Sequence, residues 1–333
     1  MNDVNVLQSS TFTQYLRDSP LVLVDIGARG GPSENWQAAL PHLSVIGFEP
    51  DPEEHARFQK AAPANECYLN AALWHEPPDQ MLNLTRSPGS SSILEPNLDF
   101  LRRFPNNERF EVVGTETLKT DTLDRQLGQN GITDVDFLKI DTQGTELNVL
   151  DGATNILDSV VGIELEVEFA EIYKGQPRFS DVDERIRNLG FVLFDLRPHY
   201  WKRIQGADYG RSKGQIIFSD ALYLRCPEGV AEMLARIQDD SARQQKLTRA
   251  VSVCAVYGYG DYALEILEAA SETVSSDLVT ELKQSFAANA TGRTWRAPSF
   301  PGSRRVRNFF YSLYEAFRSG PQWADSAKTL GNL

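Results

Sequence analysis

The chain has few cysteines, no long apolar run and fewer basic than acidic residues. Its three cysteines lie far apart and form no C-x-x-C pair or cysteine–histidine cluster, so we read them as reduced thiols and expect no zinc site. No apolar stretch approaches the ~20 residues of a membrane-spanning helix. The 33 lysines and arginines face 46 acidic residues, which argues against nucleic acid as a partner because phosphates need a basic face.

The first residues, MNDVNVLQSSTF, also lack the basic segment and apolar core of a secretory signal. With the reduced cysteines, this predicts a cytoplasmic protein that has no membrane span. The 333 residues, 41% hydrophobic and 24% charged, suffice for one sizeable α/β domain and a smaller appendage. We therefore expect a domain over residues 1–225 and a helical extension over residues 226–333.

The glycine-rich segment LVLVDIGARGG (21–31) lacks the G-x-G-x-x-G pattern of dinucleotide-binding proteins. A buried strand is predicted to end at Asp25, after which Gly27 and Gly31 let the backbone turn closely. A carboxylate there would repel a pyrophosphate but pair with a cationic amino group, which counts against a nicotinamide-dependent oxidoreductase. The next strand ends at Glu49, 22 residues after Gly27, where a carboxylate can accept from both ribose hydroxyls. S-adenosylmethionine combines these features.

Apolar runs and turn signals alternate along the first two thirds of the chain. They predict a doubly wound α/β fold with a seven-stranded, mostly parallel sheet and a ligand at the carboxyl ends of strands 1, 2 and 4. A long loop before the last strand permits an antiparallel edge strand. Strands are expected at 21–25, 44–48, 66–72, 135–140, 160–166, 191–196 and 216–224, with added strands at 81–85 and 110–119, and helices at 33–40, 52–61, 144–157 and 180–190.

Beyond Pro227 no strand signal recurs, and the spacing of apolar residues is helical over 228–249 and 261–288. A terminal helix is expected at 307–318. We interpret this extension as a helical lid or a dimer face in preference to a separate binding module, which leaves a homodimer open.

The segment DFLKIDTQGTELNVLDGA (136–153) carries the second group of candidate residues. A strand ends at Asp141, and Glu146 falls in the first turn of the helix that follows. Glu164 and Glu166 point to one face of the next strand, so together with Asp141 they are expected to form one acidic pocket. Such a pocket would supply a general base, or would bind a divalent cation, which we do not favour.

His199, Tyr200 and Trp201 follow the sixth predicted strand and are expected to form a polar and aromatic loop. There His199 is a further candidate base, and the aromatic rings would suit the apolar face of a sugar. Ser90–Ser92 could line the same pocket or simply form a flexible loop.

Taken together, six segments in this order resemble the FkbM-type S-adenosylmethionine-dependent methyltransferases. The resemblance covers about residues 20–225 and implies the class I methyltransferase fold, which is Rossmann-like. It also implies S-adenosylmethionine as methyl donor and O-methylation of a hydroxyl on a sugar, glycan or natural product. The segments are VLVDIGARGG, VIGFEPDP, SPGSSSILEPN (87–97), TDTLDRQL (120–127), FLKIDTQGTELNVLDGA and VVGIELEVEFAEIY (160–173).

Carried onto this chain, the resemblance assigns the parts of the cofactor site. Asp25, Gly27 and Gly31 would shape the methionine end, Glu49 would hold the ribose, Asn70 would face the adenine and Asp141 would lie near the sulfonium. The catalytic candidates come from the residues themselves and are Asp141, Glu146, Glu166 and His199, and we assign no metal ligands.

One position departs from the family, which commonly has asparagine where this chain has Arg29. An arginine beside a cationic cofactor is unfavourable unless it points away or pairs with an acid. The rival interpretations are an N- or carboxyl-methyltransferase and a catalytically silent cofactor-binding protein of the same fold. The acceptor, a small molecule or a glycan, is not identified by the sequence.

Overall fold

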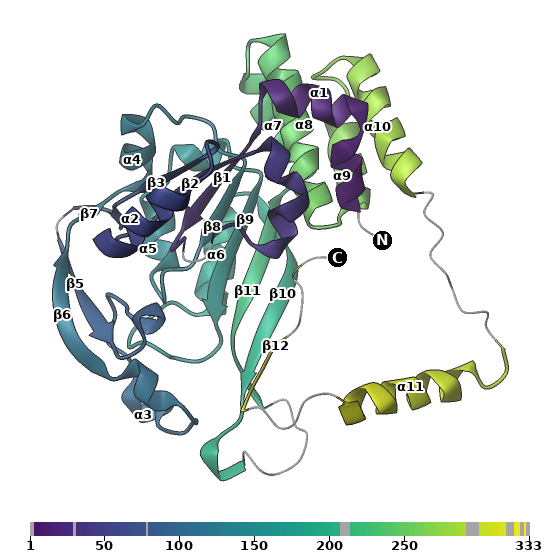
Figure 1. Cartoon of the computed structure of the whole chain (residues 1–333). Coiled ribbons are helices and arrows are strands. Elements are labelled where there is room, and N and C mark those ends of the chain that lie inside the picture. Colours follow the sequence, from purple (N-terminus) through teal and green to yellow (C-terminus); the bar gives the residue numbers. More distant parts are fainter. Residues whose placement is uncertain are drawn as a thin grey trace.

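The computed structural model describes residues 3–28, 31–77, 79–206, 214–290, 300–317, 323–326 and 330. The expectation about Arg29 therefore lies outside the described residues. At the centre is a mixed sheet with the strand order β12-β10-β11-β9-β8-β1-β2-β3 (Figure 1). The seven predicted strands are all present, and a short strand, β12, joins them at one edge. The strands are β1 (Leu21–Ile26), β2 (Leu43–Phe48), β3 (Glu66–Leu69), β8 (Phe137–Ile140), β9 (Gly162–Glu168), β10 (Phe191–Trp201), β11 (Gln215–Arg225) and β12 (Ala324–Ser326).

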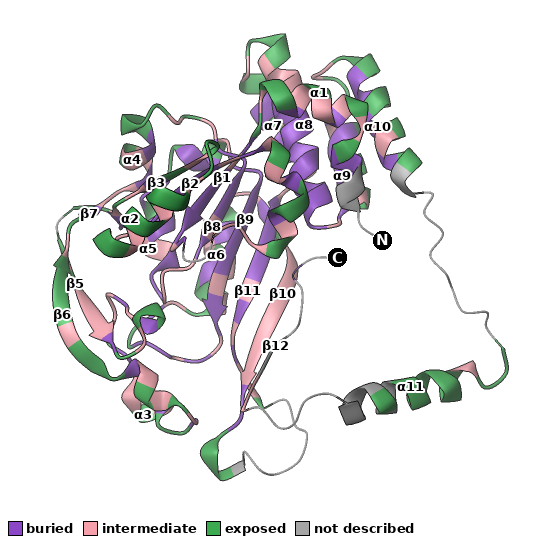
Figure 2. Cartoon of the chain, in the orientation of Figure 1, coloured by how far each residue is buried: buried purple, intermediate pink, exposed green. Residues whose placement is uncertain are grey.

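Strands β3, β2, β1, β8 and β9 are parallel, whereas β11, β10 and β12 pair antiparallel. The continuous apolar runs follow from burial on both faces of the sheet. Along β1, Leu21 and Leu23 enter one hydrophobic cluster, while Val24 and Ile26 enter the cluster on the opposite face. The sheet is thus the middle layer of three (Figure 2).

One face of the sheet is covered by the helices that connect its parallel strands. Leucine, isoleucine and valine side chains of α4, α5 and α6 pack there against β8, β9 and β11. Helix α2 begins where Asp51 accepts hydrogen bonds from the backbone amides of Glu53 and Glu54, with Pro52 in the first turn. These helices and the short 3₁₀ turn η5 are α2 (Pro52–Ala61), α4 (Leu123–Gln129), α5 (Glu146–Asp151), η5 (Ile156–Asp158) and α6 (Phe179–Asn188).

The opposite face is covered by helices from both ends of the chain. The described residues between β1 and β2 form a 3₁₀ helix in place of an α-helix, and α8, from the C-terminal region, lies over the sheet beside it. Every residue of α8 from Lys246 to Val256 is buried, as expected for a central helix. This layer consists of η1 (Asp3–Gln8), α1 (Ser10–Asp18), η2 (Glu34–His42), α7 (Pro227–Arg236), α8 (Asp240–Val256), α9 (Gly260–Ala269) and α10 (Ser276–Ala290).

Buried ion pairs fasten α8 to the sheet. Lys246 Nζ lies 2.7 Å from Asp136 Oδ1, and Arg249 Nε lies 2.9 Å from Asp136 Oδ2. Asp136 also accepts a hydrogen bond from the backbone amide of Val22 in β1, 2.9 Å away. Helices α7, α8, α9 and α10 therefore share a core with the sheet, and the role of the extension as a lid or dimer face stays a prediction.

A smaller lobe stands beside the carboxyl ends of the parallel strands. Its β5–β6 ribbon is antiparallel, and the short pair β4–β7 links it to the sheet. Its elements are β4 (Ala72–Leu73), β5 (Gln80–Thr85), η3 (Pro88–Ser90), α3 (Leu98–Leu101), η4 (Asn107–Phe110), β6 (Val112–Leu118) and β7 (Thr120–Asp121).

Two expectations about the second half of the chain are wrong. Residues 199–201 are not a loop, because β10 continues through them, paired with β11 on one side and β12 on the other. The His199 ring stacks on Phe218 of β11 with 4.2 Å between centroids, which holds this polar stretch in the ladder. A strand also recurs after Pro227: β12 has three residues, too few for an apolar pattern. The remaining elements are η6 (Ile204–Gly206) and α11 (Ser303–Phe317).

Within the described part of the chain, no helix combines the length and apolar character needed to cross a membrane.

Candidate functional site

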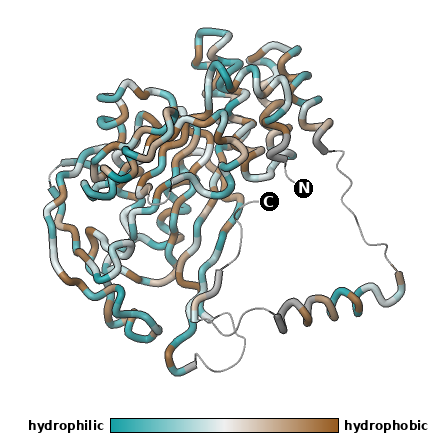
Figure 3. Tube along the Cα trace, in the orientation of Figure 1, coloured by the Kyte–Doolittle hydropathy of each residue, from teal (hydrophilic) through white to brown (hydrophobic). Residues whose placement is uncertain are grey.

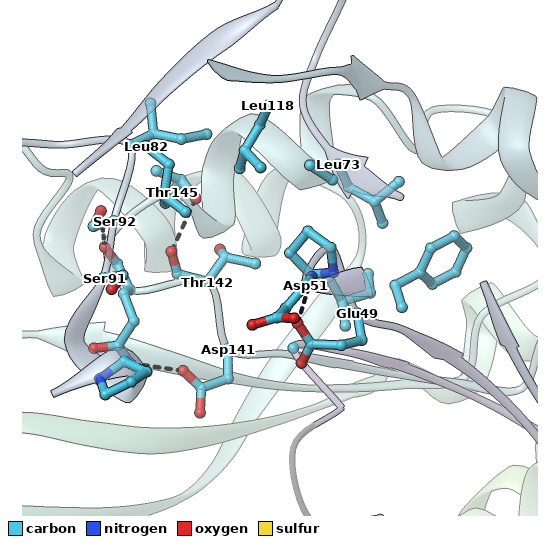
Figure 4. A pocket seen from close by; sticks show the side chains of 18 of the residues that line it. Glu49, Asp51, Leu73, Leu82, Ser91, Ser92, Leu118, Asp141, Thr142 and Thr145 are labelled. Carbon is cyan, nitrogen blue, oxygen red and sulfur yellow. Dashed lines mark hydrogen bonds between the residues drawn. The ribbon is translucent and has the colours of Figure 1, made fainter. Parts of the chain in front are cut away.

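A cavity of about 720 Å³ opens at the carboxyl ends of β1, β2 and β8, where the parallel sheet was predicted to bind its ligand. In Figure 4, Glu49 and Asp51 lie on one side of it and Ser91 and Ser92 on the other, with Asp141 between them. Apolar side chains from β4, β5 and β6 face them, namely Leu73, Leu82 and Leu118, and Leu84 of β5 also lines the cavity. The cavity thus has a polar floor and an apolar roof.

Gly27 forms the turn at the end of β1 and lines the cavity. Its φ is +80°, a conformation that favours glycine, and its amide donates to the carbonyl oxygen of Phe48 at 3.1 Å. A Cβ at this position would lie 2.1 Å from the carbonyl oxygen of Asp141. Gly31 also has a positive φ, +75°, but it does not line the cavity. The close approach of β1 and β8 therefore depends on Gly27.

Asp25 lies behind this turn and is almost fully buried. Lys139 Nζ, from the cavity wall, donates to Asp25 Oδ1 at 2.9 Å. Burial would lower the pKa of Lys139, but the charges of Asp25 and Asp141 raise it above its ordinary value. Among the residues that the structure describes, Asp25 Oδ2 has no hydrogen-bond partner. One buried carboxylate oxygen is thus available as an acceptor beside the cavity.

Glu49 stands at the end of β2 and is buried in the cavity wall. Its Oε1 accepts from the backbone amide of Asp51 at 2.9 Å, which fixes the carboxylate against the start of α2. The Nδ2 of Asn70 donates to the carbonyl oxygens of Glu49 and Pro50, each at 2.9 Å. Asn70 itself is exposed and does not line the cavity, whereas Leu73 of β4 does.

Asp141 lines the cavity at the end of β8, beside the β1 turn. Its Oδ1 accepts from Gln143 Nε2 at 2.8 Å, and Gln143 Oε1 accepts from the Tyr173 hydroxyl at 3.0 Å. The same hydroxyl lies 2.9 Å from the carbonyl oxygen of Ser90, so its single proton is shared between the two oxygens. Ser92 Oγ donates to the carbonyl oxygen of Gln143. The loop around the three serines is therefore tied to the Asp141 loop, which the sequence did not reveal.

Glu146 begins α5 but does not line the cavity. Its Oε1 accepts from the backbone amides of Thr142 and Gly144, at 2.9 and 3.2 Å, and from the Thr142 hydroxyl. In this turn Gln143 has a φ of +58° and Gly144 a φ of +96°. A positive φ is strained for a residue other than glycine, so the Glu146 carboxylate holds a strained turn in place. Burial, with a contribution from the negative charge of Asp141, raises the pKa of Glu146 to about 7. The geometry gives Glu146 a structural contact with the loop.

The raised pKa of Glu146 predicts a pH-dependent stability. Between its ordinary value of 4.5 and about 7, the folded protein holds this proton more tightly than the unfolded chain does, so stability falls as pH rises through this window. Glu146→Gln should remove this contribution to the pH dependence. Its free energy of unfolding should therefore fall between pH 5 and 7.5 by about 2–3 kcal/mol less than that of the wild type. Urea unfolding at both pH values measures it. Glu265→Gln, at an exposed position, should behave as the wild type does.

Further acids on β9 gather beside Asp141. Burial, and then the charges of Asp141 and Glu168, raise the pKa of Glu166 well above its ordinary value. Glu168 is buried, and its Oε1 has no hydrogen-bond partner within the described residues. The structure thus brings Glu166 close to Asp141, as expected. In the described ranges no group of three or more histidine, cysteine or acidic side chains is arranged to hold a metal ion.

Glu164 points to a different neighbour. Its Oε2 accepts from the hydroxyl of Tyr257, at the end of α8, at 2.7 Å, and Trp36 Nε1 donates to that hydroxyl at 3.3 Å. Burial raises the pKa of Glu164 above its ordinary value. The C-terminal helical layer therefore reaches the strand that carries the acidic residues.

His199 lies on β10 and contacts an acid of the neighbouring strand. Its Nε2 lies 3.2 Å from Asp220 Oδ2, and Arg197 Nε donates to the same oxygen at 2.7 Å. Asp220 pairs in register with Glu166, so His199 connects to the acidic group only through Asp220. His199 does not line the cavity.

Comparison with known proteins supplies a family for this arrangement. Residues 25–193 match the model of the methyltransferase FkbM domain. The 2-O-methyltransferase NoeI of Sinorhizobium fredii (strain NBRC 101917 / NGR234) is 26% identical over 164 residues, which are 46% of this chain and 66% of that protein. The match therefore spans slightly less than two thirds of the relative's length.

Solved structures give weaker matches. The N-terminal domain of EvdMO1 in the presence of SAH and D-fucose aligns with a TM-score of 0.31 and 8% identity, over 68% of this chain and 83% of that one. Magnesium protoporphyrin IX methyltransferase (ChlM) from Synechocystis PCC 6803 with bound SAM aligns with a TM-score of 0.32 and 10% identity, over 67% and 79%. These low scores support no argument about function.

Proposed function

This chain belongs to the FkbM methyltransferase family, and from that premise we propose that it transfers a methyl group from S-adenosylmethionine to a hydroxyl of a sugar, glycan or natural product. The observation that carries the proposal is the cavity at the ends of β1, β2 and β8. Glu49 stands at one side of it, Asp141 lies near its centre, and the Gly27 turn adjoins both. The strand order β8-β1-β2 places the Gly27 turn between the two carboxylates, so the ribose would lie at Glu49, and the sulfonium and the methionine chain beside the Gly27 turn and Asp141.

The residues present fit such a donor. Glu49 is fixed by the Asp51 amide and would accept from the ribose hydroxyls, while Leu73 and the neighbouring apolar roof would contact the adenine. The unpaired oxygen of Asp25 would accept from the α-amino group, directly or through water, behind the Gly27 turn. Buried acceptors of this kind are stabilised by a cationic donor.

The donor supplies a methyl carbon that its positive sulfur already activates. The protein's part is to orient the acceptor oxygen and to remove its proton. We assign that part to Asp141, which lines the cavity and whose carboxylate is oriented by the Gln143 amide. Glu166 is the second candidate base, because burial and the charge of Asp141 raise its pKa above the ordinary value and so favour uptake of a proton.

A hydroxyl acceptor is favoured by the serine and threonine side chains that share the cavity with Asp141. Ser91, Ser92, Thr142 and Thr145 line it, and such groups can hydrogen-bond the hydroxyls of a sugar. The matching relative NoeI is described as a 2-O-methyltransferase, which agrees with this class of acceptor. Glu146 would act by holding the 142–144 turn, and His199 by fixing Asp220.

Incubation with methyl-labelled S-adenosylmethionine and matched acceptors tests the proposal. Label is expected on glycosides with free hydroxyls and should survive mild alkali, because a methyl ether is stable whereas a methyl ester is hydrolysed. Alkali-labile label would indicate a carboxyl-methyltransferase, and label on amines alone would indicate N-methylation. Cofactor binding with no turnover over the whole panel would favour the catalytically silent protein. The same assay with EDTA tests the prediction that no divalent metal is used.

A further inference from the structure

Helix α11 (Ser303–Phe317) stands apart from the layers of the fold (Figure 1). Its large apolar side chains are exposed: Phe309 is 61% and Phe310 63% accessible, and Val306 and Leu313 are also exposed. These four positions follow the i, i+3, i+4, i+7 spacing of one helix face. Figure 3 shows hydrophobic and hydrophilic positions alternating along this helix. Water-exposed phenylalanines on one face indicate a binding surface.

Nothing in the described body of the protein is shaped to cover this face. The other exposed large hydrophobic side chains, including Met81, Val113, Val192, Ile204 and Leu264, are scattered over β5, β6, β10, η6 and α9. Such isolated side chains are ordinary on a protein surface. Apart from its own α11, a second copy of the chain would therefore offer this face no apolar patch of matching size among the described residues.

The charge of α11 is opposite to that of the rest of the protein. Arg304, Arg305 and Arg307 are exposed in its first turns, with no acidic residue in the first turn. None of the three forms an ion pair with another described residue. Residues 289–333 hold seven basic residues against two acidic ones, whereas the whole chain has a net charge of −13. The basic residues are thus concentrated beside the exposed aromatic face.

We propose that α11 binds an anionic lipid surface. Phe309 and Phe310, with Val306 and Leu313, would enter the boundary between headgroups and acyl chains, and the three arginines would contact the lipid phosphates. Three arginines beside an aromatic face suit this surface, because each guanidinium can neutralise a lipid phosphate while the methylene groups of the side chain contact the apolar part of the lipid. The helix would lie in the plane of the membrane without crossing it.

The nearest described elements on either side of α11 belong to the folded body. Helix α10 precedes it, and β12 follows it at the sheet edge. There the ring centroids of Trp323 and Trp201 lie 5.6 Å apart, and the backbone amide of Lys202 donates to the carbonyl oxygen of Trp323. A lipid-bound α11 would therefore keep the whole protein at the surface. This inference does not depend on the identity of the methyl acceptor.

Co-sedimentation of the full chain with vesicles tests the proposal. Vesicles of phosphatidylcholine with phosphatidylglycerol (3:1) should bind the protein, vesicles of phosphatidylcholine alone should bind it weakly, and raising the salt concentration should release it. Arg304→Gln/Arg305→Gln/Arg307→Gln should lower the partition coefficient about 100-fold. Phe309→Ser/Phe310→Ser should also abolish binding.

Matched variants elsewhere on the surface serve as controls. Arg57→Gln/Arg125→Gln/Arg187→Gln removes the same charge from other exposed positions, and Met81→Ser/Val113→Ser removes exposed apolar groups. Both should bind vesicles as the wild type does, and all variants should bind S-adenosylhomocysteine equally. Equal vesicle binding by the α11 and control variants would overturn the proposal, as would no binding by the wild type. So would a dimer that the Phe309/Phe310 variant loses in the absence of vesicles.

Discussion

Gly27→Ala is expected to lower the affinity for S-adenosylhomocysteine at least 100-fold. The new Cβ would lie 2.1 Å from the carbonyl oxygen of Asp141, so the β1 turn and the end of β8 would have to separate. A backbone oxygen cannot rotate away as a side chain can, and the positive φ adds a cost of about 1–2 kcal/mol for any L residue. The separation falls between Asp141 and the turn, where the donor's reactive end should lie. Titration calorimetry on the folded variant measures the loss.

Gly31→Ala is the matched control for that experiment. Its φ of +75° imposes the same backbone strain, but in the described part of the chain a Cβ at Gly31 would meet no atom within 4 Å. The affinity of this variant should stay within tenfold of the wild type. Wild-type affinity in a folded Gly27→Ala protein would contradict the placement of the donor beside the β1 turn.

Asp141→Asn is expected to lower turnover about 10²- to 10⁴-fold while changing cofactor affinity only a few-fold. The asparagine keeps the shape of the side chain and can still accept from the Gln143 amide. It cannot take up the proton of the acceptor hydroxyl. Single-turnover rates and the dissociation constant of S-adenosylhomocysteine, measured on the same preparation, separate the two effects.

Glu116→Gln controls for the loss of a negative charge. Glu116 also lines the cavity, from β6, but it is exposed and lies on the ribbon opposite the sheet. Its variant should turn over at nearly the wild-type rate. If Asp141→Asn retained its turnover and Glu166→Gln lost it, the base would be Glu166. The wild-type rate should then rise with pH, because the raised pKa of Glu166 leaves it protonated at lower pH.

The parallel half of the sheet could be predicted because its strands are buried on both faces. In β1 every residue except Val22 is buried, so the sequence reads as one apolar run with an acid at its end. The later part of β10 gave no such signal, since residues 192–200 are only partly buried or exposed and include polar side chains. Its length depends on neighbours, β11 and β12, that come later in the chain.

The candidate site was predictable to the extent that strand ends determine it. Asp141, Glu49 and Gly27 follow strands directly, and the structure places all three at one cavity. Asn70 follows a strand as well, but its side-chain amide donates to the carbonyl oxygens of Glu49 and Pro50, after β2, and the side chain lies outside the cavity. Strand position indicates where a residue lies and not which neighbour its side chain will bind.

Two side-chain contacts that decide the role of a candidate acid were not predicted. Glu164 was expected beside Glu166 in the acidic pocket, since both point to one face of β9. Its carboxylate is instead bound by Tyr257, 93 residues later, on a helix that the sequence suggested was an appendage. Likewise, the sequence made Glu146 a candidate base, but in the structure its carboxylate accepts three hydrogen bonds from the turn of residues 142–144.

The central claim is that the cavity at the ends of β1, β2 and β8 binds the methyl donor. Titration calorimetry with S-adenosylhomocysteine, with NADH as the control ligand, tests it most directly. The wild type should bind the first with micromolar affinity and the second not at all. Glu49→Ala should lose tenfold or more, because hydrogen bonds to a charged acceptor contribute about 1.5–3 kcal/mol each. Failure of the wild type to bind S-adenosylhomocysteine, or unchanged affinity in folded Glu49→Ala, would contradict the account.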